Sequence, residues 1–109
     1  MQGLELKLFD IISNVGEARS NYIEALREAK VGKYEEAEKL MVEGNEAFSK
    51  GHDGHSELIQ SDVSGTPVTI SLLVIHAEDL LMSAETFKII ALEMIDNYKR
   101  IDALEAKIK

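Results

Sequence analysis

Hydrophobic residues recur every three or four positions along most of this 109-residue chain, which is the spacing of one face of an α-helix. Clusters of turn-forming residues interrupt the pattern at residues 31–33 and 61–67. The pattern therefore predicts three helices, at about residues 4–30, 34–60 and 67–108.

The first predicted helix carries one apolar stripe and is followed by a glycine. Gly32 suits the left-handed conformation that ends many helices, and Lys30 suits the negative end of the helix dipole. The apolar positions of this helix are Leu4, Leu8, Ile11, Ile12, Val15, Tyr22, Ala25, Leu26 and Ala29.

The second predicted helix is weaker in its middle, where Gly51 and Gly54 bracket His52 and Asp53. Each glycine costs about 1 kcal/mol of helix propensity relative to alanine. We therefore expect residues 51–55 to remain in the helix as a bent or frayed stretch. The apolar positions are Tyr34, Ala37, Leu40, Met41, Ala47, Phe48, Leu58 and Ile59.

The third predicted helix has the strongest periodicity. Thr66 is a candidate N-cap and Pro67 suits the first helical position, so we expect this helix to begin there. Its apolar stripe consists of Ile70, Leu73, Ala77, Leu80, Ala84, Phe87, Ala91, Met94, Tyr98 and Ile101.

Three helices joined by short loops predict an all-α fold, an up-down-up three-helix bundle with a long third helix, in a single domain spanning residues 1–109. The third helix should outreach its neighbours by about 20 Å. Because an isolated chain would leave its additional apolar residues in water, the pattern also predicts a helical oligomer. These additional residues are Leu72, Ile75, Ile89, Ile90 and Leu92.

The charge balance and the absence of cysteine narrow the class of function. Twelve Lys and Arg against 20 Asp and Glu give a net charge of -8, which disfavours nucleic acid as a partner. The sequence shows no signal core and no apolar run of about 18 residues, so we expect a soluble, cytoplasmic protein that does not insert into a membrane. With no cysteine, its chemistry must use histidine, carboxylates or hydroxyls.

His76 and Asp79 lie three residues apart in the otherwise apolar run 68–82. Burying such groups is costly without a partner, so the pair marks either a site or an unusual core. If copies of Asp79 met at a symmetry axis about 5 Å apart, each pair would repel by about 3 kcal/mol, and a hard cation such as magnesium or a shared proton would have to compensate. The plainer alternatives are an Asp79 that points to water or to a lysine, and a His76 that is a satisfied core histidine.

Several segments together resemble one family. The run SLLVIHAEDLLM at 71–82 is similar to the signature of the lactose/cellobiose-type IIA proteins of the bacterial phosphoenolpyruvate-dependent sugar phosphotransferase system. The run IISNVGEAR at 11–19 resembles the family's first helix, AKVGKYEEA at 29–37 its first turn, and His52 with LIQ at 58–60 the end of its second helix.

The resemblance implies a phosphocarrier that forms a homotrimer of three-helix units. His76 matches the phosphoryl-accepting histidine, modified on the nitrogen remote from the backbone (tele-phosphohistidine). Asp79 matches the aspartate shared across the trimer axis around a magnesium-type divalent cation. The expected partners are HPr as phosphoryl donor and a IIB component as acceptor, during uptake of a disaccharide such as lactose, cellobiose or chitobiose through a membrane IIC component.

Three residues depart from the family pattern. Leu80 stands where a second histidine is usual, and His55 and Glu78 each stand where glutamine is common. His52 matches a family histidine, which a helix-helix hydrogen bond explains as well as catalysis does.

A second hypothesis is a helical metal-binding or interaction module without phosphoryl transfer. Its possible ligands are His52, His55, His76, Asp53 and Asp79, which suit zinc or manganese. Phosphorylation by HPr separates the carrier from this module.

Overall fold

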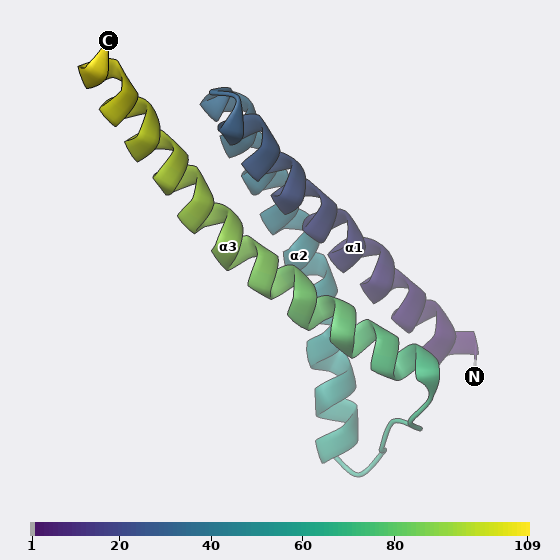
Figure 1. Ribbon diagram of the computed structural model, residues 1–109. Coiled ribbons are helices and arrows are strands. Elements are labelled where there is room, and N and C mark those ends of the chain that lie inside the picture. The colour runs from purple at the N-terminus through teal and green to yellow at the C-terminus, as the bar shows by residue number, and fades with distance from the viewer. Residues whose placement is uncertain (1) are drawn as a thin grey trace.

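The computed structural model describes residues 2–109, which form the three α-helices α1 (Gln2–Lys30), α2 (Tyr34–Val63) and α3 (Leu72–Ile108). They run up, down and up in a rod of 63 × 20 × 19 Å (Figure 1). The predicted all-α, three-helix architecture is confirmed.

The turn between α1 and α2 forms as the sequence predicts. Gly32 has a φ of 84°, its N–H donates to the carbonyl of Ala29 at 3.0 Å, and the N–H of Lys33 donates to the carbonyl of Glu28 at 2.9 Å. These two bonds satisfy carbonyls that the end of a helix leaves open.

A glycine with a positive φ also follows the end of α2, which lies three residues later than expected, at Val63 instead of about 60. Gly65 has a φ of 99°, and the N–H of Thr66 donates to the carbonyl of Ser61 at 3.1 Å. The sequence signal for this end was therefore Gly65, which the predicted boundary did not use.

Residues 51–55 remain in α2, as expected, but they do not fray, because α2 is an unbroken helix there. Its glycines lie against α1, and side chains in their place would collide with it. A Cβ atom on Gly54 would lie 2.9 Å from Cγ1 of Ile11, and one on Gly44 would lie 2.7 Å from Cε1 of Tyr22. The glycines let α1 and α2 approach closely, and that packing outweighs their weak helix propensity.

The predicted start of α3 at Pro67 is also wrong. The helix begins at Leu72, and the N-cap is Ser71, whose Oγ accepts the N–H of Val74 at 3.3 Å. The preceding segment is held out of a helix because Asp62 Oδ1 accepts the N–H of Val68 at 3.1 Å. As a result Ile70, expected in the apolar stripe, is 73% exposed.

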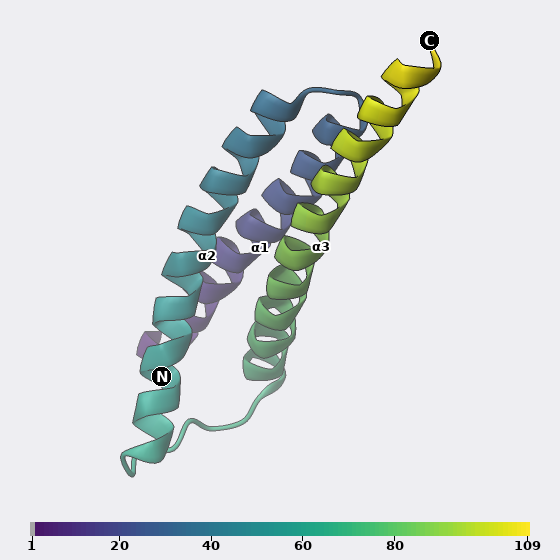
Figure 2. The same ribbon diagram turned by 90° about the vertical axis from the view of Figure 1, so that its left-hand side faces the viewer.

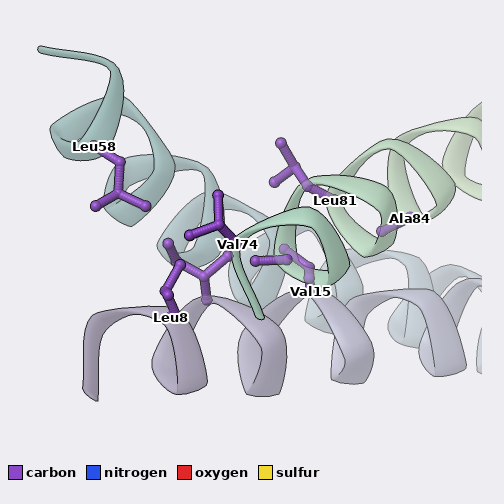
Figure 3. Packing of buried hydrophobic residues seen from close by; sticks show 8 residues of the cluster. Leu8, Val15, Leu58, Val74, Leu81 and Ala84 are labelled. Atoms are coloured by element: carbon purple, nitrogen blue, oxygen red, sulfur yellow. The ribbon is translucent and has the colours of Figure 1, made fainter. Parts of the chain in front are cut away.

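Two apolar clusters form the core, with α1 between α2 and α3 (Figure 2). In the first cluster, side chains from all three helices meet (Figure 3): Leu8, Ile11, Val15, Leu58, Val74, Ala77, Leu81 and Ala84. The second surrounds Tyr22, whose hydroxyl donates to Asn45 Oδ1 at 2.8 Å. Burying each large apolar side chain contributes about 1.5–3 kcal/mol.

The predicted stripe of α3 faces this core from Leu73 to Tyr98, whereas Ile101 is exposed. Helix α3 has 37 residues and α2 has 30, so it exceeds α2 by about 10 Å, half of the predicted overhang. Its C-terminal end projects beyond the turn between α1 and α2 (Figures 1 and 2).

Helices α2 and α3 contact each other far less than either contacts α1. Polar side chains connect them near the two ends of α3. His55 contacts Glu78 close to its start, and the hydroxyl of Tyr34 donates to Asp102 close to its end.

Candidate functional site

His76 lies in the second turn of α3, on its exposed surface. Asp79 follows one turn later and is exposed as well. The expectation that the apolar run would bury this pair therefore does not hold for a single chain. Val74, Ala77 and Leu81 of the same run face the core, and at about 100° per residue the other positions turn outward.

Asp79 is surrounded by apolar side chains on the outward face of α3. Leu72 is 82% exposed, Ile75 54% and Met82 59%. At helical spacing these residues flank Asp79, and His76 lies at the margin of the same face, toward α1. We call the surface formed by Leu72, Ile75, Asp79, Met82 and Ile90 the outer face of α3. A single chain leaves it exposed, which is uncommon for so much contiguous apolar surface.

One margin of this outer face adjoins α1 and contains an arginine that the sequence did not single out. Arg19 Nε donates to Ser83 Oγ at 2.9 Å, and its guanidinium carbon lies 4.8 Å from the centroid of the Phe87 ring. Ser83 is seven residues after His76, so the two lie on one side of α3, about 10 Å apart along the axis. Arg19 thus supplies a fixed positive charge two turns from His76.

Leu80 occupies the turn between His76 and Ser83. It is partly buried against the first core cluster, and its Cδ2 would lie 3.7 Å from a Cβ atom on Gly16. The position where the family usually has a second histidine is therefore filled by apolar packing, without a group that could carry a proton.

The other margin of α3 brings together the two remaining departures from the family pattern. His55 Nε2 and Glu78 Oε1 lie 2.5 Å apart, with the side chain of His55 17% exposed and that of Glu78 46%. The sequence analysis treated His55 and Glu78 as two separate departures, whereas in the structure they form one pair. The pairing could not be read from the sequence, since it depends on how α2 and α3 pack.

Within the described residues, no three His, Asp or Glu side chains lie close enough together to hold a metal ion. His55 is engaged with Glu78, and the ring of His52 lies 6.2 Å from that of Phe48. The alternative of a transition-metal site within one chain is therefore not supported. A carboxylate suits a hard cation such as magnesium, but Asp79 offers only one per chain, and such ions take six or more oxygen ligands.

Comparison with known proteins places this chain in a family. The model of the family described as PTS system, Lactose/Cellobiose specific IIA subunit matches residues 6–99. The chain is 41% identical over 98 residues to the lichenan-specific phosphotransferase enzyme IIA component of Bacillus subtilis strain 168, covering 90% of this chain and 89% of that protein. It is also 41% identical over 91 residues to the oligo-beta-mannoside-specific EIIA component of the same strain, covering 84% and 83%.

A solved structure agrees with this assignment. The crystal structure of the cellobiose-specific enzyme IIA from Bacillus anthracis is 47% identical in sequence and superposes with a TM-score of 0.91, covering 94% of each chain. The chain therefore belongs to the lactose/cellobiose-specific IIA family, and it is a phosphocarrier component of a sugar phosphotransferase system. None of the helices between residues 2 and 109 is both long and apolar enough to cross a membrane.

Proposed function

We propose that His76 accepts a phosphoryl group from HPr and passes it to a IIB component. Its ring nitrogen remote from the backbone attacks phosphorus, and the bond from phosphorus to the donor breaks as the new P–N bond forms. In the second transfer, a cysteine thiolate of the IIB component attacks phosphorus and the P–N bond breaks.

The observation that carries this proposal is that His76 is exposed on α3, within the residues that the family model matches. A carrier must meet two proteins in turn, so its reacting atom has to be accessible from outside. An uncharged imidazole is a nucleophile, and the phosphoryl group that it accepts can be passed on to a second acceptor. Phosphoryl transfer demands mainly positioning and charge stabilisation, which a side chain on a rigid helix can provide.

We further propose that the protein forms a homotrimer around α3, with a magnesium-type cation at Asp79. The exposed apolar side chains of the outer face support assembly, because a partner copy would remove them from water. Assembly would also bring copies of Asp79 together, and a divalent cation would offset their repulsion and gather the ligands that one chain lacks. The ion would thus be structural.

The relatives are named for different sugars, namely lichenan, oligo-beta-mannosides and cellobiose, although their identities to this chain lie between 41% and 47%. This similarity across sugars supports a carrier in the cytoplasm that does not touch the sugar itself. We propose that the transported molecule is a disaccharide, such as lactose, cellobiose or chitobiose, and that the membrane component recognises it.

The proposal is tested by intact mass after incubation with phosphoenolpyruvate, enzyme I and HPr, at neutral to alkaline pH. We expect one acid-labile phosphoryl group per chain in the wild type and none in His76→Ala. His52→Ala is the matched control, because it removes another exposed histidine. If His76→Ala is phosphorylated like the wild type, the assignment of His76 is wrong.

A further inference from the structure

The contact between His55 and Glu78 lies at nearly the same level along α3 as the proposed phosphoryl-accepting residue. Glu78 is two residues after His76 in α3, so the two side chains point to nearly opposite sides of the helix, about 10 Å apart. Its carboxylate meets the imidazole of His55 at 2.5 Å, and the imidazole is mostly buried.

The surroundings of this pair are acidic. Asp62 lines the same depression as Glu78, a hollow of about 260 Å³ between the end of α2 and the start of α3. The remaining lining side chains are apolar: Leu58, Ile59, Val68, Ile70 and Val74. Asp79 adds a further carboxylate on the outer face. Among the described residues that contact Glu78 or line this hollow with it, His55 is the only histidine, and there is no lysine or arginine.

We propose that His55 shields the charge of Glu78, so that an anionic phosphoryl donor can approach His76. This inference rests on the proposed function. A phosphoryl group carries about two negative charges near neutral pH, and it would be repelled by an uncompensated carboxylate nearby. His55 forms a pair with Glu78 whose net charge is zero when the imidazole is protonated, and it removes much of that repulsion.

This role makes His55 a positioning residue that acts through Glu78 and touches neither donor nor phosphoryl group.

The test is the KM for phosphorylated HPr, measured with kcat at low and at high ionic strength. In His55→Gln we expect the KM to rise about threefold to tenfold at low ionic strength with kcat little changed, as one charge about 10 Å from a doubly charged group should produce. The increase should shrink at high salt, where the screening length falls below that distance.

Three further variants distinguish shielding from simple bracing of the helices. Glu78→Gln alone, and the double variant His55→Gln with Glu78→Gln, should both have a KM no higher than that of the wild type. His55→Lys should also restore the wild-type KM, because lysine supplies the positive charge. The matched control is His52→Gln, which removes an exposed imidazole one turn away and should leave the KM unchanged.

A brace would give a different pattern. Either single glutamine substitution would then weaken activity similarly, the double variant would not recover, and salt would make no difference; that result overturns the proposal. An unchanged KM in His55→Gln overturns it too, while leaving the carrier function intact. If the wild type itself takes no phosphoryl group, the proposed function fails together with this inference. Thermal unfolding of every variant confirms that the compared proteins are folded.

Discussion

Gly51 of α2 packs directly against Val15 of α1, so closely that a Cβ atom at position 51 would overlap Cγ1 of the valine. Both residues are buried, and Ile11 and Gly54 lie in the same contact one turn away. The contact fixes the separation of α1 and α2, and the first core cluster forms around it.

Gly51→Ala should therefore destabilise the protein by up to about 2 kcal/mol, since overpacking costs about 1–3 kcal/mol and the gain in helix propensity offsets only about 1 kcal/mol. Urea unfolding followed by circular dichroism measures the effect. Gly3→Ala is the matched control, because nothing lies within 4 Å of its Cβ position, and we expect it to be neutral or slightly stabilising. Equal stability of the two variants would show that α1 and α2 are not held this close.

The start of α3 can be tested at its N-cap. Ser71→Ala should cost about 0.5–2 kcal/mol, because the N–H of Val74 loses its acceptor. Thr66→Ala should change the free energy of unfolding by less than about 0.5 kcal/mol, because Thr66 is exposed and contributes only its backbone to hydrogen bonds. The opposite ranking in urea unfolding would place the start of the helix at Pro67.

The three helices and the start of α3 show what the sequence could and could not predict. Periodicity predicted the three helices and the core stripe of α3, because burial on one face repeats with the helical turn. Thr66 and Pro67 match a helix start locally, but Ser61 Oγ donates to the carbonyl of Thr66 and Asp62 Oδ1 accepts the N–H of Val68, and these bonds hold the segment in another conformation. Such bonds are invisible to a local pattern.

The exposure of His76 was missed for a related reason. The run 68–82 is apolar on two faces, of which one packs into the core and the other remains outside. Hydrophobicity alone does not distinguish a face that packs into the core from an apolar face that stays exposed in a single chain. The pairing of His55 with Glu78 likewise depends on the packing of two helices, since the two residues are 23 positions apart in sequence.

The hydroxyl of Tyr34 provides a pH-dependent prediction. Its hydrogen bond to Asp102, together with burial and nearby carboxylates, raises the pKa of Tyr34 from 10.0 to about 12. A raised pKa means that the hydrogen bond stabilises the fold below the unfolded pKa near 10, and that this stability is lost as the pH rises through about 12.

Absorbance titration of the phenolates measures this shift. Burial also raises the pKa of Tyr22 to about 12, so the wild type should show two late-titrating tyrosines and Tyr34→Phe only one. Asp102→Asn should bring the titration of Tyr34 back toward 10, because it removes the charged acceptor. An unchanged titration in Asp102→Asn would contradict the contact.

Assembly around Asp79 predicts a dependence on divalent cations. Removing them with a chelator should weaken the proposed trimer of the wild type in sedimentation velocity, because each pair of Asp79 carboxylates, if about 5 Å apart, would then repel by about 3 kcal/mol. The Asp79→Asn variant should form a trimer whose stability does not change when the chelator is added. Asp96→Asn, with the same change of charge on another side of α3, should behave like the wild type.

The central claim is that His76 carries a phosphoryl group between two proteins, and its most direct test is discharge of the isolated phosphoprotein. Phosphorylated protein, freed of HPr, is mixed with a IIB component, and the mass of both chains is followed with time. The account predicts that the phosphoryl group leaves this chain and appears on the IIB component in equal amount. A phosphoryl group that stays on this chain, or is released only as inorganic phosphate while the IIB component accepts one from another IIA protein, would contradict it.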